Sequence, residues 1–345
     1  MRRIASTPLG FLVVGALAAA ALTGCSGSSS KSGSASALTL YNGQHEQTTD
    51  ALVAAFTKDT GIKVNVRSDD EDVLANQIEQ EGSHAPADIF YTENSPALMQ
   101  LQEKNLLAPV DKTALAEVPA QYDSPQGDWL GVSARVSVMI YNTKLVQPSQ
   151  LPTSLTQLAD PQWKGKLGLA VGETDFQPIV TSLVKSHGAA YASQWLNAVK
   201  ANAGSLTYPD NETLTSMVNS GKAAIGLINQ YYWYRLKAEN NGAMNSAIAT
   251  FAPQDPGYVM DVSGAGILAS SKHQAEAQKF IAFLGSAEAQ KIIATSDSFE
   301  YPIGSGVTTA QPETPFDQLK PTNLGIADLG DGSQAISLLQ RAQLL

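Results

Sequence analysis

The stretch LTLYNGQHEQTTDALVAAFTKDTGIKVNVRSDDEDVLANQIEQEGSHAPADIFYTEN (residues 38–94) decides the fold. Its apolar periods predict three strands and two helices in the order β-α-β-α-β, at residues 38–41, 48–60, 62–67, 72–81 and 87–91. Short strands that alternate with helices favour a mostly parallel sheet covered on both faces. The ligand site of such an α/β sheet lies at the carboxyl ends of its strands.

A second alternation of strands and helices follows a loop region with short helical turns at residues 152–165. We expect strands at 166–171 and 223–228 and helices at 176–186, 190–202, 273–284 and 287–296. Two longer alternating segments, at 131–141 and 260–269, are candidate crossovers between the two parts. The pattern therefore predicts two α/β lobes with a cleft between them, which is the usual place for a small ligand.

The first residues predict export. Basic residues precede the apolar run Gly10–Leu22, which is shorter than the roughly 20 residues of a membrane-spanning helix. Leu22-Thr-Gly-Cys25 resembles the bacterial lipobox, which implies a signal peptide at 1–24 and a lipid attached to Cys25, the only cysteine. Residues 25–37 are rich in Ser and Gly, as in a flexible tether.

Charge and cysteine content limit the function. The chain carries a formal net charge of −10, and without residues 1–24 the remaining 20 basic and 32 acidic residues give −12. Such an acidic chain is not expected to bind nucleic acid. Because no cysteine follows Cys25, the exported part has no disulfide and depends on packing for its stability.

The run Leu227-Ile-Asn-Gln-Tyr-Tyr-Trp-Tyr-Arg235 places two adjacent phenols, Tyr231 and Tyr232, after an apolar strand. As phenolates they suit a hard, highly charged cation such as Fe³⁺, whose charge can overcome a phenol pKa near 10. Adjacent tyrosines are also common in cores, so the pair alone is a weak signal. Trp233 and Tyr234 continue the helix, and we interpret them as packing residues.

Polar loops follow the first and third predicted strands. His45 lies in the first loop and Glu93 in the second, and parallel strands would bring both toward one point of the cleft. Two phenolates and a carboxylate provide three negative charges for a trivalent ion, and an imidazole adds a neutral nitrogen. Ca²⁺ and Mg²⁺ prefer carboxylates and carbonyls, while zinc and copper prefer imidazole or thiolate. The alternative roles are an exposed loop histidine and a helix N-terminal charge.

Five ordered stretches resemble those of bacterial periplasmic ferric-binding proteins, the substrate-binding components of ABC iron importers: Tyr41–His45, Pro86–Glu93, Ile228–Trp233, Asp255–Gly257 and Glu300–Pro302. The resemblance implies an α/β, type II periplasmic-binding-protein fold with two lobes, two hinge strands and a ligand cleft between the lobes. The expected lobes are residues 38–134 with 262–312 and residues 135–261 with 313–345. The resemblance also implies that the lobes close on Fe³⁺ held by His45, Glu93, Tyr231 and Tyr232.

In family members that use phosphate, a synergistic anion and a water complete the iron shell. The resemblance assigns the anion and its surroundings to Asn94, Arg135, Gly172, Glu173, Thr174, Asn211 and Asn229. The Gly172-Glu-Thr174 turn departs from the small-residue turn of those members, and a carboxylate at Glu173 would repel an anion unless it points away or is protonated. Glu173 or Asp175 in place of the anion, and a chelate such as ferric citrate, are the alternatives.

These features predict a monomeric, lipid-anchored receptor at the outer face of the cytoplasmic membrane. It would capture Fe³⁺, deliver it to an ABC permease and its ATPase, and catalyse no reaction. A receptor for an organic solute such as a polyamine, a thiamine-like cation or a sugar is the main alternative, with Trp233 and the tyrosines as a stacking surface. A hydrolytic metalloenzyme is disfavoured, because the sequence has no HExxH or Asp-rich motif.

Overall fold

The structure is a computed structural model that describes residues 37–304, 306–309 and 314–345. The predicted signal peptide, Cys25 and nearly all of the tether lie outside the described residues. In the part of the chain that is described, no helix is both long enough and apolar enough to cross a bilayer.

The described residues form ten strands and twelve α-helices, with short 3₁₀ turns between them. The strands are β1 (Leu38–Gly43), β2 (Val64–Ser68), β3 (Ile89–Thr92), β4 (Leu107–Ala108), β5 (Trp129–Asn142), β6 (Leu167–Gly168), β7 (Ile225–Asn229), β8 (Ser246–Ala249), β9 (Met260–Leu268) and β10 (Tyr301–Pro302). The helices are α1 (Glu46–Thr60), α2 (Glu71–Glu81), α3 (Ser95–Glu103), α4 (Lys112–Leu115), α5 (Phe176–His187), α6 (Ala189–Ala203), α7 (Asn211–Asn219), α8 (Gln230–Glu239), α9 (Gln274–Gly285), α10 (Ala287–Thr295), α11 (Ile326–Leu329) and α12 (Ser333–Arg341).

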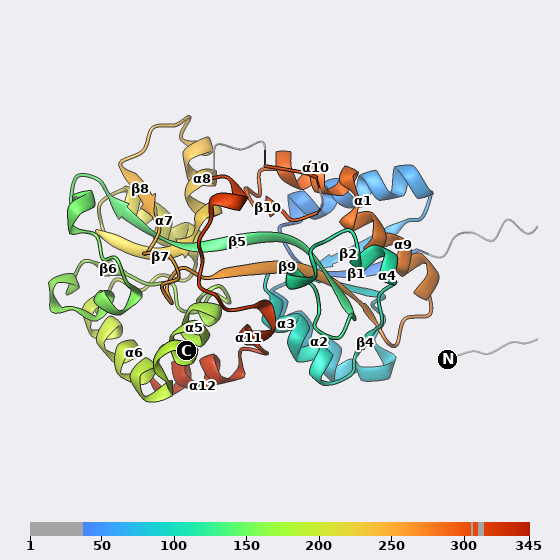
Figure 1. The fold of residues 1–345 in the computed structure, drawn as a ribbon, viewed down its shortest axis with the longest axis horizontal. Helices are drawn as coiled ribbons and strands as arrows, with labels where there is room; N and C mark the ends of the chain where they lie inside the picture. Colours follow the sequence, from blue (N-terminus) through green and yellow to red (C-terminus); the bar gives the residue numbers. More distant parts are fainter. Residues whose placement is uncertain (1–36, 305, 310–313) are drawn as a thin grey trace, which may run out of the picture. The chain divides into compact units, whose positions relative to one another are not determined.

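The sheet has the strand order β2-β1-β3-β9-β5-β7-β6. Strand β1 runs parallel to β2 and β3, and β6 runs parallel to β7. The two long strands differ from the predicted parallel pattern: β9 is antiparallel to β3 and β5, and β5 is antiparallel to β7 and β8. The sheet is therefore mixed, with parallel pairs at its two ends and antiparallel crossovers in the middle (Figure 1).

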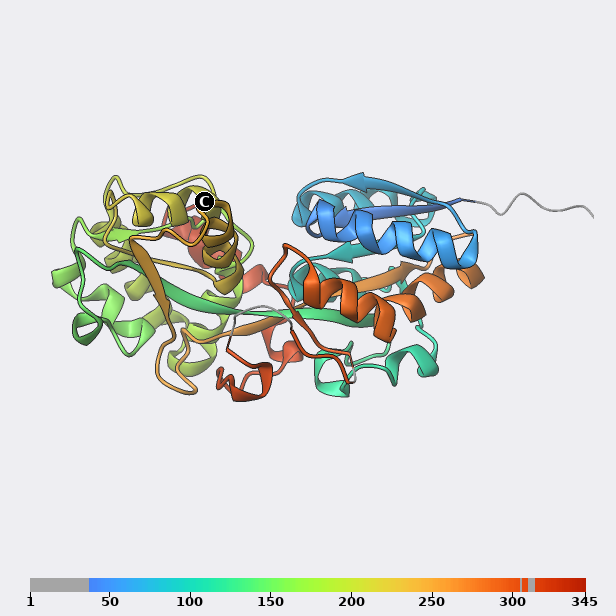
Figure 2. The same ribbon diagram turned by 90° about the horizontal axis from the view of Figure 1, so that it is seen from above.

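Strand β5 belongs to both halves of the sheet. Its residues 129–136 pair with β9, and its residues 137–142 pair with β7 and β8. Figure 2 shows β5 and β9 running between two groups of helices. We call the half built on β1–β3 the N-lobe and the half built on β6–β8 the C-lobe. The fold is two-lobed as predicted, while the residue boundaries given above for the lobes stay a prediction.

Local sequence explains where two of the helices begin or end. Gly61 ends α1 in the left-handed conformation (φ 73°), which glycine adopts without strain. The Asp210 carboxylate caps α7 by accepting a hydrogen bond from the backbone N–H of Thr213 at 2.6 Å.

The strand predicted at 166–171 shortens to Leu167–Gly168, and helices α3, α7 and α12 are additional to the predicted ones. The short helical turns predicted within 152–165 are present as 3₁₀ turns at Leu155–Ala159 and Pro161–Trp163.

Each lobe has its own aromatic packing. In the N-lobe the Phe56 ring of α1 packs on Phe280 and Phe283 of α9, with ring centres 5.0 and 5.6 Å apart. In the C-lobe Phe176 of α5 stacks on Trp195 of α6. Near the carboxyl end of the chain, α11 contacts both α3 and α5, so a third segment besides β5 and β9 touches both lobes.

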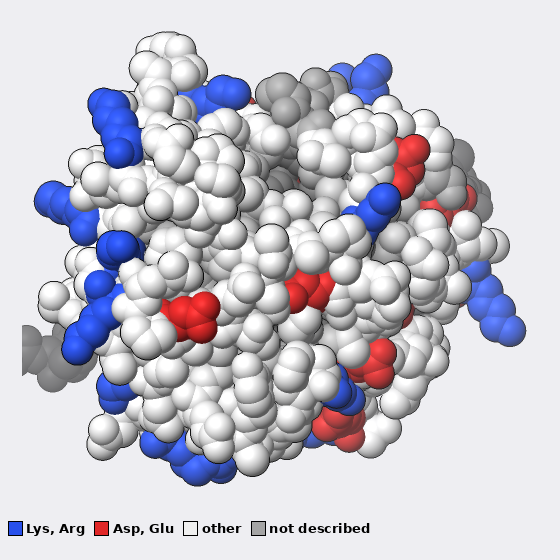
Figure 3. All heavy atoms as spheres, turned by 60° about the vertical axis from the view of Figure 1, so that its left-hand side comes forward, with Lys and Arg blue, Asp and Glu red and all other residues white. Residues whose placement is uncertain are grey.

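Charge is unevenly divided along the chain. The predicted N-lobe ranges hold 20 acidic and 8 basic residues, while the C-lobe ranges hold 12 and 11. Figure 3 brings the C-lobe side forward and shows its Lys and Arg side chains spread around the face. Among the residues described there, they form no single basic patch of the kind that binds nucleic acid.

Candidate metal centre

Three strand ends supply the predicted metal ligands. His45 follows β1 as the first residue before α1, and Glu93 follows β3 directly. Tyr231 and Tyr232 lie in the first turn of α8, directly after β7. Strands β3 and β7 are buried along their length and β1 is largely buried, so the first polar residues beyond each strand emerge at the edge of its lobe.

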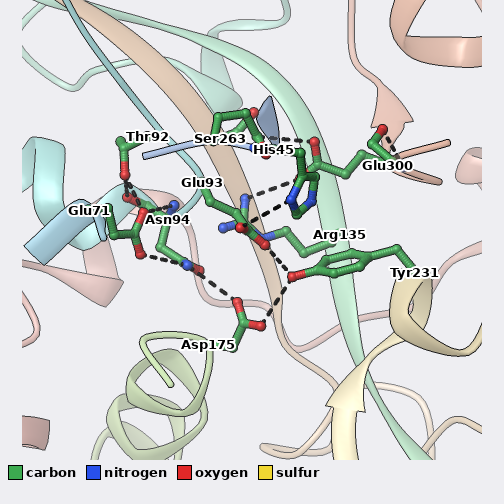
Figure 4. A network of polar contacts seen from close by, with 12 residues as sticks. His45, Glu71, Thr92, Glu93, Asn94, Arg135, Asp175, Tyr231, Ser263 and Glu300 are labelled. Carbon is green, nitrogen blue, oxygen red and sulfur yellow. Dashed lines mark hydrogen bonds and ion pairs between the residues drawn. The ribbon is translucent and has the colours of Figure 1, made fainter. Parts of the chain in front are cut away.

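The structure brings His45, Glu93 and Tyr231 together (Figure 4), and Tyr232 packs beside Tyr231. His45 Nδ1 lies 3.7 Å from Glu93 Oε2, and the Tyr231 hydroxyl donates a hydrogen bond to Glu93 Oε1. The two phenol rings pack against each other with centres 4.2 Å apart. Both hydroxyls also donate to Asp175 Oδ2, at 3.2 Å from Tyr231 and 3.0 Å from Tyr232. Glu93 and Asp175 therefore flank the phenols from opposite lobes.

Burial controls the protonation of this group. Tyr231 is 0% and Tyr232 6% exposed, and burial, followed by the Asp175 and Glu93 carboxylates, raises the pKa of both phenols well above the usual value. Burial, with Arg235 and Arg135 nearby, lowers the pKa of His45 well below its ordinary value. A neutral imidazole is the form that can ligate a metal. Its Nε2 atom is buried and meets no hydrogen-bond partner among the described residues.

Asp175 occupies the place between the amide side chains that were predicted to hold an anion. Its Oδ1 accepts a hydrogen bond from Asn94 Nδ2 at 3.3 Å, and its Oδ2 accepts one from Asn211 Nδ2 at 3.1 Å. The carboxylate is 8% exposed. Burial raises its pKa to about 6, with Glu93 adding to the effect and Arg135 opposing it.

The Gly172-Glu-Thr174 turn lines the cleft beside Asp175. Glu173 Oε1 accepts a hydrogen bond from the backbone N–H of Asn211 at 3.1 Å, and burial, followed by Asp175, raises the Glu173 pKa to about 8. Thr174 Oγ1 accepts a hydrogen bond from Asn94 Nδ2 at 3.1 Å. Asn229 lines a small void of about 10 Å³ together with Asp175 and Asn211, so it lies close to these two residues.

Arg135 lies on β5 near the predicted metal ligands and is 0% exposed. Glu300 Oε1 lies 3.9 Å from its Nη1, and none of its nitrogens has a hydrogen-bond acceptor within the described ranges. Burial alone would lower the Arg135 pKa, but Asp261, Glu300, Glu93 and Asp175 together raise it, so the group stays charged. Asp261 and Glu300 were not predicted as site residues, although Glu300 lies in one of the matched stretches.

Glu300 is the nearest unpredicted carboxylate. Its Oε2 accepts hydrogen bonds from Gln44 Nε2 at 3.1 Å and Ser133 Oγ at 2.8 Å. Ligand atoms of His45, Glu93 and Glu300 all lie within 4.8 Å of one another. Burial raises the pKa of Glu300 to about 7, and Arg135 opposes that rise. The signal in the sequence is an acidic residue just before a short buried strand.

Two cavities adjoin the predicted ligands, and His45 lines both. One of about 700 Å³ is lined largely by acidic residues: Glu46, Asp69, Asp70, Glu71, Asp72, Glu93, Glu173, Asp210 and Glu212. The other, of about 520 Å³, includes Tyr232, Phe299 and Asp297, and Arg235 lines both. The Arg235 guanidinium lies over the Tyr231 ring, 4.7 Å from its centre, and 3.6 Å from Glu212. An acidic cleft of this kind favours a cationic ligand.

Trp233 lies away from the cleft. Among the described residues it lines a separate cavity of about 570 Å³ with Tyr234 and Lys237, and its indole N–H donates to Ser246 O at 3.3 Å. This position agrees with a packing role. Trp233 is therefore not part of the stacking surface predicted for an organic-solute receptor, whereas Tyr232 lines the cleft cavity.

Comparison with known proteins shows relatives that match most of this chain. The family model for bacterial extracellular solute-binding proteins matches residues 42–291. The Fe(3+)-binding periplasmic protein of Serratia marcescens is 39% identical over 309 residues, which are 89% of this chain and 90% of that protein. Iron-bound HitA from Pseudomonas aeruginosa aligns with a TM-score of 0.85 and 42% identity, over 89% of this chain and 99% of that one.

A Trichodesmium protein in complex with iron and citrate ligands aligns with a TM-score of 0.77 and 32% identity, over 89% of this chain and 99% of that one. The matches to the family model, to the Serratia protein and to these structures each cover most of the chain. The chain belongs to the bacterial extracellular solute-binding proteins and, among them, to the ferric-iron-binding periplasmic proteins.

Proposed function

We propose that this protein captures Fe³⁺ in the cleft between its lobes and delivers it to an ABC permease without catalysing a reaction. His45, Glu93, Tyr231 and Tyr232 are the proposed ligands. The observation that carries the proposal is the approach of two buried phenols from one lobe to a carboxylate and an imidazole from the other. Anionic oxygen donors with one neutral nitrogen suit a hard trivalent cation.

Binding requires that both phenols lose their protons, because a metal ligand must be deprotonated. In the metal-free site those protons are shared with Glu93 and Asp175 through hydrogen bonds. A trivalent ion takes the place of the two protons between the phenols and the carboxylates. The raised pKa of the phenols disfavours weakly charged ions, which gain too little from phenolate binding to offset deprotonation.

We infer that Asp175 stands in for the synergistic anion of the phosphate-using relatives. It receives hydrogen bonds from the amides of Asn94 and Asn211 and contacts both phenols. An additional phosphate or carbonate between the same amides would meet the Asp175 carboxylate, and two like charges at one site repel. This favours binding of the ion alone over binding of an anionic chelate such as ferric citrate.

A visible absorption band tests the proposed ligands. Addition of ferric citrate to the wild type should produce a visible phenolate-to-iron charge-transfer band. The band should disappear in Tyr231→Phe/Tyr232→Phe and remain in Tyr191→Phe, which removes the hydroxyl of an exposed tyrosine on α6. A colourless wild type that contains no iron by elemental analysis would overturn the proposal. Stabilisation by an organic cation in a thermal-shift screen, with none by Fe³⁺, would support the alternative receptor.

We further propose that the chain is anchored as a monomer to the outer face of the cytoplasmic membrane through a lipid on Cys25. The support is the Leu22-Thr-Gly-Cys25 sequence and the Ser- and Gly-rich stretch that follows it. Metabolic labelling with a radioactive fatty acid should mark the wild type. Label on a Cys25→Ala variant would contradict the anchor and leave the iron proposal unaffected.

A further inference from the structure

Glu71 is a buried carboxylate with no part in the proposed ligand set. It is the first residue of α2 and is 5% exposed, although its neighbours in the Asp69–Asp72 run are exposed. Its oxygens accept hydrogen bonds from the Thr92 hydroxyl, the Asn94 backbone N–H at 2.7 Å and Asn94 Nδ2 at 2.7 Å. Glu71 therefore accepts hydrogen bonds from Thr92 and Asn94, the two residues that flank Glu93 in the chain, as Figure 4 shows.

Gly43, the last residue of β1, packs directly against Glu71. A Cβ atom on Gly43 would lie 2.6 Å from the Glu71 Cβ and 2.8 Å from its Cα, so only glycine fits at this position. The Gly43 carbonyl also accepts a hydrogen bond from the Glu93 N–H at 3.2 Å. The ends of β1, β2 and β3 thus meet around one carboxylate beneath the Glu93 loop.

Glu71 also fixes the direction of the Asn94 amide. A carboxylate only accepts hydrogen bonds, so the NH₂ end of Asn94 must face Glu71. The same Nδ2 atom reaches across the cleft to Thr174 Oγ1 at 3.1 Å and Asp175 Oδ1 at 3.3 Å in the C-lobe. Asn94 therefore connects Glu71 of the N-lobe to the carboxylate proposed to complete the metal site.

We propose that Glu71 is a positioning residue that couples closure of the cleft to assembly of the metal site. It places the Glu93 carboxylate and directs the NH₂ group of Asn94 toward Asp175. The hydrogen bond from Asn94 to Asp175 then connects the two lobes, with the Asn94 amide already held in the required orientation. This inference rests on the proposed function, because the bridge ends on the residues assigned to iron.

Substitution of Glu71 by glutamine keeps the volume of the side chain and reverses one hydrogen-bond role. The NH₂ group of the substituted side chain would face the Asn94 NH₂ group, and two donors cannot bond to each other. Rotation of the Asn94 amide relieves that conflict, but it turns the donor away from Asp175. Glu71→Gln is therefore expected to fold and to lose the bridge between the lobes.

The experiment compares Glu71→Gln with Glu79→Gln and wild type. Glu79 lies on the same helix and accepts hydrogen bonds from Gln100 and Lys104 of the α3 region, away from the cleft. Iron loss to excess EDTA should be about tenfold faster in Glu71→Gln, as for other residues that orient metal ligands. Its iron-induced decrease in radius of gyration should be smaller than that of wild type. Equal iron loss and equal compaction in all three proteins would overturn the proposal.

A metal-free measurement separates this inference from the proposed function. Glu71→Ala removes the acceptor altogether, so hydrogen exchange of the Asn94 backbone N–H, which donates to Glu71, should be faster in apo Glu71→Ala than in apo wild type. If the wild type binds no iron, the proposed function fails, while faster exchange at Asn94 still supports the positioning role. Unchanged exchange at Asn94 contradicts that role whether or not iron binds.

Discussion

Arg135 of β5 and Asp261 of β9 are directly paired residues of the two strands that connect the lobes. The Arg135 charge is fully buried, and four carboxylates raise its pKa: Asp261, Glu300, Glu93 and Asp175. Glu93 and Asp175 come from opposite lobes and face each other across the proposed iron position. Arg135 therefore supplies a permanent positive charge, which offsets the repulsion between these carboxylates when no metal is bound.

Replacement of Arg135 should destabilise the metal-free protein. Arg135→Met leaves the Asp261 and Glu300 carboxylates buried without a counter-charge, and loss of one partner of a buried ion pair costs about 3–5 kcal/mol. The free energy of unfolding in urea measures the loss. Arg135→Met/Asp261→Asn should recover part of it, because one of the uncompensated carboxylates is gone. Additive losses in the double variant would show that the two residues do not interact.

Asp175 should decide whether iron binding needs an added anion. Wild type is expected to bind Fe³⁺ equally well with and without phosphate, because its own carboxylate fills the space between Asn94 and Asn211. Asp175→Ala opens that space, so its affinity should fall at least about tenfold in phosphate-free buffer and recover when phosphate is added. Titration against a competing chelator gives both affinities.

Glu173→Gln is the matched control for the anion region. It removes a nearby ionisable carboxyl group and leaves the Asp175 hydrogen bonds in place. Its iron affinity should not respond to phosphate. A wild type whose affinity rises in phosphate would contradict the assignment of Asp175.

Gly43 should tolerate no side chain. Gly43→Ala forces its methyl group against the Cβ and backbone of Glu71, so α2 must shift. Overpacking of this kind costs about 1–3 kcal/mol, and the melting temperature should fall accordingly. Iron should also dissociate faster, because the Glu93 loop moves with Glu71. Gly82→Ala at the other end of α2 meets no atom within 4 Å, but its φ of 51° makes it a test of backbone strain alone.

Much of the site could be predicted because its residues follow strands that the hydrophobic pattern identifies. Glu93 comes directly after β3 and His45 lies two residues after β1, and parallel pairing brings their loops to one edge. The same reasoning could not select Glu71 from four consecutive acidic residues. Its inward direction depends on the missing Cβ of Gly43, a contact that only the folded chain makes.

The antiparallel crossovers also lay beyond the sequence pattern. The alternation near residues 131–141 and 260–269 predicts long buried strands but gives neither their direction nor their register. The pairing of Arg135 with Asp261 depends on both, as does the place of Glu300 beside them. Charged residues in buried strands are the signal that could have identified this group, because an unpaired charge is too costly to bury.

Asp123 should make stability depend on pH at a place remote from the metal. Its carboxylate is 8% exposed and accepts a hydrogen bond from the Gly131 N–H at 2.9 Å, and burial raises its pKa to about 7. The unfolded chain has the ordinary value near 3.9. Between these values the folded protein binds the extra proton, so the Asp123 contribution is complete below pH about 4 and is lost as pH rises through about 7.

Asp123→Asn keeps an acceptor for Gly131 and cannot titrate. Its free energy of unfolding, relative to wild type, should therefore increase from pH 5 to pH 8, by at most about 1.4 kcal/mol for each pH unit crossed below the folded pKa. Urea unfolding of both proteins across that range measures this difference in free energy. The contributions of the other buried carboxylates are the same in both proteins and cancel in the difference. Asp111→Asn removes an exposed carboxylate and controls for net charge. A constant difference between Asp123→Asn and wild type would show that Asp123 is ionised in the folded protein throughout.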